Sequence, residues 1–305
     1  MDWQRLFQKL LHEGDVVFDI GAYQGEVSSF CSGLIGPSGR IVTFEPRKDH
    51  FKTLKLRARR LGNVTCESYV VSSMSGTAMF YFGVEPHASG ASTIVPELAN
   101  TDRLGKKIKS ELVESISIDD YCARHSIAPS FIKLDVEGAE DLVMAGAENT
   151  LRAHKPAVYF EQSVIADTVP HTVRFLRDLG YEVAICDFFR FDNVISNIWA
   201  HGNYVTSDCD ALRTKLITFD DDSLIHCKPM HTNMIAIHPT GIKRTSLRDV
   251  DSVELRDAVL QAVRPPPPAP VRKNIAYYAK ATIKRFMPNF LLQTLRYARN
   301  RMRYL

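Results

Sequence analysis

The first residues suited to chemistry lie where an apolar run meets a glycine turn. The run VVFDI at 16–20 is apolar enough for a buried strand, and the sequence continues through Gly21 and Gly25 as DIGAYQG. Glycines there permit a tight turn and a close approach of the backbone to a ligand at the start of the next helix. The G-x-x-x-G spacing differs from the G-x-G-x-x-G that seats a pyrophosphate. Asp19 would repel a diphosphate but attract an ammonium, which favours a nucleoside that carries an amino acid. In the alternative interpretation, this segment binds no ligand and is only a tight connection between a strand and a helix.

A second acid ends the next predicted strand, GRIVTFE at 39–45. At the carboxyl end of a strand in an open α/β sheet, a carboxylate such as that of Glu45 accepts hydrogen bonds from both hydroxyls of a ribose. The alternative is a solvated carboxylate at a strand end. The two segments together favour the ribose-binding interpretation.

A third cluster follows another buried strand, in the sequence FIKLDVEGAE at 131–140. Alternation along an extended chain places Lys133, Asp135 and Glu137 on one side, where the ammonium would lower the pKa of both carboxyl groups. Glu161 ends the following strand at the same edge of the sheet. Glu137 or Glu161 is therefore a candidate general base for a hydroxyl.

Other interpretations of this cluster stay open. In a purely structural one, Glu137 caps the next helix and Glu140 lies on its surface. A divalent cation held by Asp135, Glu137 and Glu161 also remains open, although we expect no metal. The group His226, Cys227, His231 and His238 matches no closed zinc pattern.

Composition describes an ordinary globular protein. The 305 residues are 45% hydrophobic and 24% charged, and no run approaches the roughly 18 apolar residues of a spanning helix. The N-terminal segment reads as a short amphipathic helix at 2–12 rather than a secretory signal. We therefore expect a cytoplasmic protein whose six cysteines stay reduced.

Charge is unevenly distributed along the chain. The net charge is +3, yet residues 265–305 hold nine of the 38 basic residues and no acid, which leaves 29 bases against 35 acids in residues 1–264. A mildly acidic body argues against a nucleic-acid groove. The basic tail at 272–305 has amphipathic helical spacing. It suits either an anionic membrane surface at the inner membrane face or packing against the domain or a partner.

Strand-like and helix-like segments alternate from residue 16 to about 240. This order predicts an α/β fold with a doubly wound, mostly parallel, seven-stranded Rossmann-like sheet and helices on both faces. We expect one domain at 1–264, with a polar, helix-prone insertion at 83–114 and an irregular one at 188–231. A proline-rich linker at 265–271 would precede the tail.

The segments DIGAYQG, FEP, SIDDY, IKLDVEGAE and YFEQS occur in an order and at spacings that resemble the FkbM methyltransferases. That resemblance implies a Rossmann-like fold and S-adenosylmethionine as cofactor. It implies that the 66–72 segment lies near the adenine and Asp135 beside the sulfonium. Tyr23 stands where the family often has Asn. The implied cofactor-binding residues are Asp19, Gly21, Ala22, Gly25, Glu45, Pro46 and Asp135.

The function expected from these segments is O-methylation of a hydroxylated acceptor, such as a sugar of a glycan or glycolipid. The catalytic candidates are Asp135, Glu137 and Glu161, with His87 and His125 as less favoured bases. The candidates for contact with the acceptor are His87, Ser89, Ser92 and Lys133. Two other functions stay open: a nicotinamide-dependent oxidoreductase on the same sheet, and a non-catalytic membrane-associated scaffold.

Overall fold

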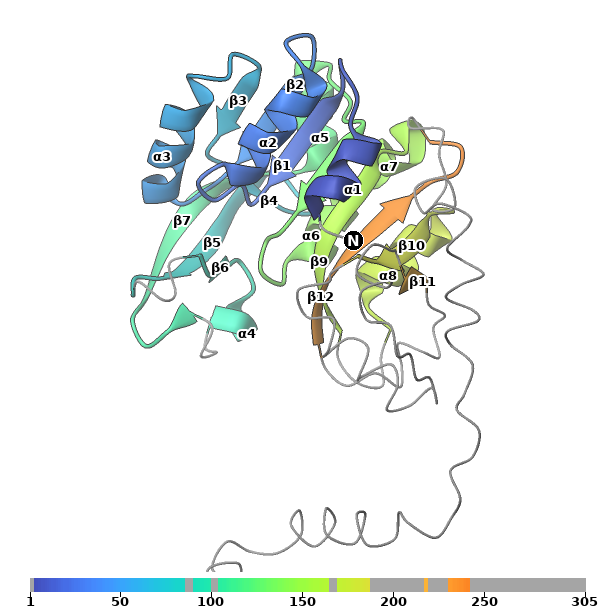
Figure 1. The fold of residues 1–305 in the computed structure, drawn as a ribbon. Helices are drawn as coiled ribbons and strands as arrows, with labels where there is room; N and C mark the ends of the chain where they lie inside the picture. Colours follow the sequence, from blue (N-terminus) through green and yellow to red (C-terminus); the bar gives the residue numbers. More distant parts are fainter. Residues whose placement is uncertain are drawn as a thin grey trace, which may run out of the picture. The chain divides into compact units, whose positions relative to one another are not determined.

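The computed structural model describes residues 3–85, 90–99, 104–164, 169–186, 217–218 and 230–241 (Figure 1). His87, Ser89, nearly all of the 188–231 insertion, the linker at 265–271 and the tail at 272–305 lie outside these residues. Within the described part, no helix is long and apolar enough to cross a membrane.

The main sheet joins eight strands in the order β11-β10-β12-β9-β8-β1-β2-β3. Neighbours from β3 through β9 are parallel, whereas β12 runs antiparallel to both β9 and β10. The mostly parallel sheet is thus confirmed. The expected count of seven is one short, because the two-residue β11 adds to the edge from within the 188–231 insertion. The strands are β1 (Val16–Ile20), β2 (Arg40–Phe44), β3 (Val64–Glu67), β8 (Phe131–Leu134), β9 (Ala157–Val164), β10 (Glu182–Ile185), β11 (Ile217–Thr218) and β12 (Met230–Ile237).

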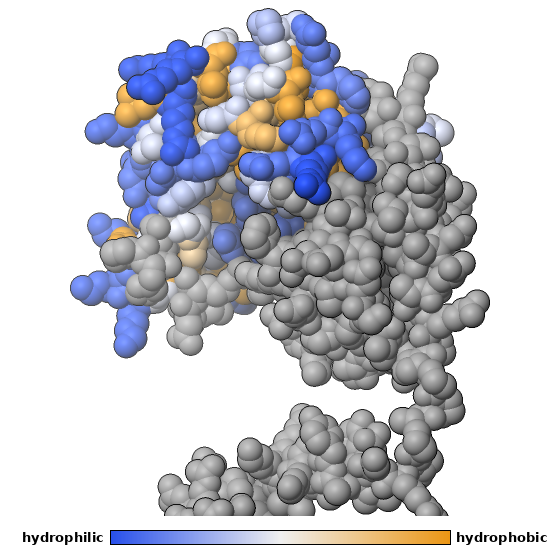
Figure 2. Space-filling model, viewed as in Figure 1, coloured by the Kyte–Doolittle hydropathy of each residue, from blue (hydrophilic) through white to orange (hydrophobic). Residues whose placement is uncertain are grey.

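Helices cover both faces of this sheet, and each face has its own core. Along β1 and β8, Val17 and Phe131 pack with α1 and α2, whereas Phe18 and Ile132 pack with the helices of the opposite face. Both sides of these strands are buried, which explains their continuous apolar sequences. Hydrophilic residues dominate the outer face over α2 and α3, with apolar patches between them (Figure 2). The helices are α1 (Trp3–Leu10), α2 (Glu26–Ile35), α3 (Lys48–Ala58), α5 (Ile118–His125), α6 (Glu140–Ala145), α7 (Glu148–His154) and α8 (His171–Asp178).

A smaller sheet replaces most of the expected helix-prone insertion. Strands β4 (Val70–Val71), β5 (Gly76–Gly83), β6 (Ser92–Thr93) and β7 (Ile108–Ile116) lie in the order β4-β7-β5-β6. Among the described residues of this insertion, the helical expectation for 83–114 was wrong except at the single turn α4 (Pro96–Ala99). Pairing of β7 with β5 along its whole length outweighs the helical propensity of a stretch rich in Lys, Glu and Leu.

The apolar run at 63–71 is divided between the two sheets. Its first half is β3, which pairs with β2, and its end is β4, which pairs with β7. The residues between them carry the chain from one sheet to the other. This crossing brings the smaller sheet to the carboxyl ends of β1 and β2.

The N-terminal helix docks through aromatic side chains. Phe7 has no exposed surface, and its ring meets those of Phe131 and Tyr159 edge to face at 4.8 and 5.1 Å. Trp3 packs edge to face against the same Phe7 ring. The helix expected at 2–12 is therefore a built-in part of one core.

We expect Phe7→Ala to lower the free energy of unfolding by about 3–5 kcal/mol, because it leaves a cavity under α1. Urea denaturation would measure this loss. The exposed neighbour Gln8 provides the control, and Gln8→Ala should change stability by less than about 0.5 kcal/mol. Equal effects of the two substitutions would show that α1 is not docked.

Candidate functional site

A cleft of about 280 Å³ opens at the carboxyl ends of β1, β2 and β8. The main sheet contributes one wall and the smaller sheet, with Phe80, Ser92 and Thr93, contributes the other. Open α/β sheets place their ligands at this edge. From the main-sheet side the lining residues include Ile20, Gly21, Tyr23, Phe44, Glu45, Pro46, His50, Asp135, Val136 and Glu137.

The glycine turn after β1 is shaped by the chain's own backbone. Gly21 has φ +73°, and a Cβ atom there would lie 1.8 Å from the carbonyl oxygen of Asp135. Gly25 has φ +85°, and its Cβ would lie 2.6 Å from Leu54 Cδ1. Gly21 lines the cleft, but Ala22 and Gly25 do not. Ala22 and Gly25 form part of this turn, and their expected contact with the cofactor stays a prediction.

A buried ion pair lies behind this turn. Lys133 Nζ donates a hydrogen bond to the Gly21 carbonyl at 2.7 Å and lies 3.4 Å from Asp19 Oδ1 and 3.6 Å from Asp135 Oδ2. Asp19 is fully buried, and its other oxygen accepts a hydrogen bond from Ser28 Oγ. Burial alone would lower the pKa of Lys133, but the carboxylates of Asp19 and Asp135 outweigh it and raise that pKa.

Asp19 and Lys133, which were both expected to contact ligands, meet each other in this ion pair. The ammonium that Asp19 meets is that of Lys133, and Asp19 does not line the cleft. Lys133 was expected to contact the acceptor, but its side chain is 7% exposed and is occupied by partners in the chain. Both residues connect the segments that form the cleft floor, and their expected ligand contacts stay predictions.

Glu45 directly follows β2, which ends one residue earlier than expected, and it lines the cleft. Its carboxylate accepts hydrogen bonds from the backbone N–H groups of Tyr23 and Arg47, both at 2.9 Å. His50 Nδ1 lies 3.9 Å from the same carboxylate. Burial raises the pKa of Glu45 to about 7, although the two backbone hydrogen bonds act in the opposite direction. Pro46, the next residue, also lines the cleft.

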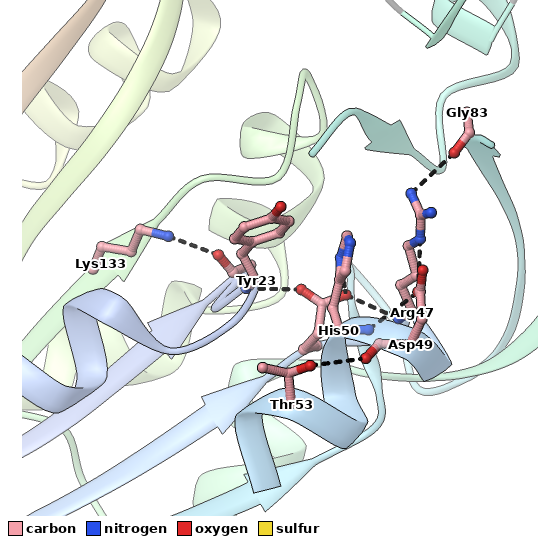
Figure 3. A network of polar contacts seen from close by, with 9 residues as sticks. Tyr23, Arg47, Asp49, His50, Thr53, Gly83 and Lys133 are labelled. Carbon is pink, nitrogen blue, oxygen red and sulfur yellow. Dashed lines mark hydrogen bonds and ion pairs between the residues drawn. The ribbon is translucent and has the colours of Figure 1, made fainter. Parts of the chain in front are cut away.

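Two residues around Glu45, His50 and Arg47, were not identified from the sequence, and Tyr23 was noted only as a departure from the family (Figure 3). Tyr23 has φ +51°, and its ring meets that of His50 at 4.3 Å between centroids. Arg47 is buried and donates to the Gly83 carbonyl at 3.0 Å, which ties β2 to the end of β5. Sequence spacing carries no signal for these contacts, because they depend on how the smaller sheet folds back.

The three predicted catalytic acids come together. One carboxylate oxygen from each of Asp135, Glu137 and Glu161 lies within 4.8 Å of the others. The expected reason was wrong, however, since β8 ends at Leu134 and Glu137 has φ +54° in a turn. Asp135 and Glu137 line the cleft, whereas Glu161 does not. Within the described ranges, these are the acids whose spacing would allow them to share a cation, and exposed acids are common without one.

Glu140 holds the turn that carries these acids. It is 5% exposed rather than on the helix surface, and its Oε1 accepts hydrogen bonds from the N–H groups of Gly138 and Val136 at 3.2 and 3.4 Å. Burial raises its pKa to about 7 against the opposing effect of these hydrogen bonds. The sequence does contain a signal for this role, because Glu140 is an acid in the first turn of a predicted helix and lies two residues after Gly138.

Three other residues considered in the sequence analysis differ in where they lie relative to the cleft. Ser92 lies at the cleft wall from β6. His125 is outside the cleft and stacks on Tyr121 one turn earlier in α5, with 4.2 Å between ring centroids. His238 follows β12 and packs edge to face against Tyr181, as an ordinary structural residue.

Lys133→Met should lower the free energy of unfolding by about 3–5 kcal/mol, because it leaves the Asp19 carboxylate buried without its cation. Urea denaturation would measure the loss. The double variant with Asp19→Asn removes the stranded charge and should recover part of it. A loss below about 1 kcal/mol for Lys133→Met would contradict the assigned role.

Glu140→Gln should stabilise the protein at pH 8 relative to wild type, but not at pH 4.5. A folded-state pKa raised from 4.5 to about 7 means that the folded protein holds this proton more tightly. Its contribution to stability is therefore present below pH 4.5 and is lost as pH rises to about 7. Glutamine keeps the acceptor oxygen without the charge. Thermal unfolding across this range would show the gap between variant and wild type, and a gap that does not change with pH would refute the assignment.

Comparison with known proteins gives a consistent pattern. Residues 19–183 match a model of the methyltransferase FkbM domain. The chain is 30% identical over 151 residues to the hexuronic acid methyltransferase AglP of Haloferax volcanii, a match that covers 49% of this chain and 56% of AglP. It is 28% identical over 200 residues to the 31-O-demethyl-FK506 methyltransferase FkbM of Streptomyces tacrolimicus, covering 57% of this chain and 75% of that protein. The match thus spans little more than half the length of AglP.

Solved structures with a similar fold include methyltransferase FkbM from Methylobacillus flagellatus KT. It is 17% identical, with a TM-score of 0.39, and the match covers 73% of this chain and 43% of that one. Another is fibrillarin from Aeropyrum pernix in complex with S-adenosyl-L-methionine. It is 15% identical, with a TM-score of 0.36 and coverage of 74% and 67%.

Proposed function

This chain belongs to the FkbM methyltransferase domain family, and on that premise we propose that it transfers a methyl group from S-adenosylmethionine to a hydroxyl oxygen of a sugar or related natural product. The observation that carries the proposal is the pair of acids on the cleft floor. Glu45 directly follows β2 and Asp135 directly follows β8, and both line the same cleft beside the Gly21 turn. In this arrangement Glu45 would bind the ribose of the cofactor, and Asp135 would lie beside its positively charged sulfur.

The cofactor would lie across the carboxyl ends of β2, β1 and β8. Glu45 has two oxygens, each already fixed by one backbone N–H, and their remaining lone pairs suit the two ribose hydroxyls. Tyr69, Val70 and Val71 line the cleft and fall within the 66–72 segment expected near the adenine. The Gly21 turn would lie beside the methionine part.

Methyl transfer forms one bond and breaks one. The acceptor oxygen attacks the methyl carbon as the carbon–sulfur bond breaks, which gives S-adenosylhomocysteine and a methyl ether and releases the hydroxyl proton. In-line positioning supplies most of the rate enhancement, and a base removes the proton of a weakly nucleophilic alcohol. Of the two candidate bases, Glu137 is favoured because it lines the cleft, whereas Glu161 does not.

The class of acceptor is supported by the names of the two relatives. One is described as a hexuronic acid methyltransferase, and the other as acting on 31-O-demethyl-FK506. Ser92 and Thr93 of β6 carry hydroxyl groups and line the cleft. Thr93 Oγ1 already accepts a hydrogen bond from the Val95 N–H, so Ser92 is the better candidate to bind the acceptor.

We expect Glu137→Gln to reduce methyl transfer from labelled S-adenosylmethionine by about 10²–10⁴-fold, because the variant lacks the base. Its affinity for S-adenosylhomocysteine, measured by calorimetric titration, should not change. The matched control is Glu161→Gln, which should retain most of the activity. If the two variants lost activity equally, or Glu137→Gln lost none, the choice of base would be wrong.

Cofactor binding itself separates this function from its competitors. Wild-type protein should bind S-adenosylhomocysteine and show no heat of binding with NADH. Binding of NADH alone would revive the oxidoreductase interpretation. If neither bound, the scaffold interpretation would be favoured.

A further inference from the structure

Among the residues that the structure describes, no strand lies beside one edge of β7 along most of its length. β7 pairs with β5 from Ile108 to Ser115, but on its other side it meets β4 only at Ser115 and Ile116. In Figure 1, β7 is the outer long strand of the smaller sheet. Residues 108–110, 112 and 114 are exposed. An unpaired edge of this kind is a template for pairing with another strand.

The hydrogen-bond pattern identifies which residues of β7 face this edge. The Lys107 carbonyl accepts from Val84 N–H on the β5 side, whereas the Ile116 carbonyl accepts from Ser72 N–H on the β4 side. Backbone groups alternate between the two sides of a strand. The N–H and C=O groups of Ile108, Ser110 and Leu112 therefore point towards the open edge.

The side chains along this edge are complementary to their own reversed sequence. When two copies of KKIKSELVE at 106–114 are aligned antiparallel about Ser110, Ile108 faces Leu112 and Lys109 faces Glu111. Lys106 likewise faces Glu114. The neighbouring register, centred on Glu111, would place like charges opposite each other, and the register centred on Leu112 contains no opposite-charge pair.

The side chains of Ile108 and Leu112, which face each other in this register, are apolar and exposed on one face of the smaller sheet. Ile108 is 39% exposed and Leu112 is 66% exposed. Met79 of β5, which pairs with Leu112 across the strands, is 43% exposed. In the Ser110-centred arrangement, Leu112 of each copy would cover Ile108 of the other beside Met79, and would remove apolar surface from water.

We propose that a second copy of this chain docks on the open edge of β7, antiparallel about a two-fold axis at Ser110. Three residue pairs face each other across the axis, and each pair exchanges two backbone hydrogen bonds. One is Ser110 with Ser110, and the other two are the symmetric pairs of Ile108 with Leu112. The two smaller sheets join into one continuous sheet. The interface is isologous, as in most homodimers, and leaves the cleft floor of the main sheet untouched.

Crosslinking at the two-fold axis tests this register. In Ser110→Cys the two Cα atoms would be about 5.5 Å apart across the axis. That separation lies within the disulfide range of about 4.4–6.8 Å. The matched control, Leu112→Cys, would place its two copies about 14 Å apart. Mild oxidation should give a crosslinked dimer with Ser110→Cys, and none with Leu112→Cys or wild type. Equal crosslinking of both variants, or none with Ser110→Cys, would overturn the proposal.

Charge exchange provides a second test, read out by sedimentation equilibrium. Wild type should have twice the mass of the chain. Lys109→Glu places like charges opposite Glu111 and should shift the protein to monomer, and adding Glu111→Lys should restore the dimer. Glu111 also pairs with the exposed Lys48 at 2.7 Å, a surface contact of small energetic value. Circular dichroism would confirm that each variant is folded. A monomeric wild type, or a dimer unaffected by Lys109→Glu, would overturn the proposal.

Discussion

The site depends on a single buried ammonium. Lys133 is the last but one residue of β8, and its Nζ contacts the Gly21 carbonyl, Asp19 and Asp135. This atom thereby joins the ends of two neighbouring parallel strands, whose turns would otherwise be free to separate. A buried charge is tolerated only where partners compensate for its lost hydration. The compensation here comes from the segments that the cleft requires.

The acids near this ammonium divide into two groups by whether they line the cleft. Asp19 and Glu140 are buried and hold backbone or side chains in place. Asp135 and Glu137 line the cleft, as does Glu45, whose oxygens are fixed by backbone N–H groups. The buried acids fix the turns, and the turns direct the other carboxylates into the cleft. A binding site gains from such fixed groups, because little reorganisation is needed when a ligand arrives.

The sequence was informative where local pattern and tertiary structure agree. The runs around β1, β2 and β8 are apolar on both faces, and Glu45 follows from its place at a strand end. Alternation along the chain placed Lys133 beside Asp135, but it carried no signal for the contact between Lys133 and Asp19, which joins two different strands. Glu137 was placed correctly for the wrong reason, since its left-handed backbone is not encoded in alternation. The strand at 108–114 was missed because its charges suit a helix until β5 is present to pair with it.

The most direct test of this account is a crystal structure with S-adenosylhomocysteine bound. The account predicts both ribose hydroxyls within hydrogen-bond distance of Glu45, the adenine against Tyr69–Val71, and the sulfur beside Asp135. Lys133 should keep its contacts with Asp19 and the Gly21 carbonyl. A ligand bound elsewhere on the chain, or a ribose that makes no contact with Glu45, would contradict the central claim.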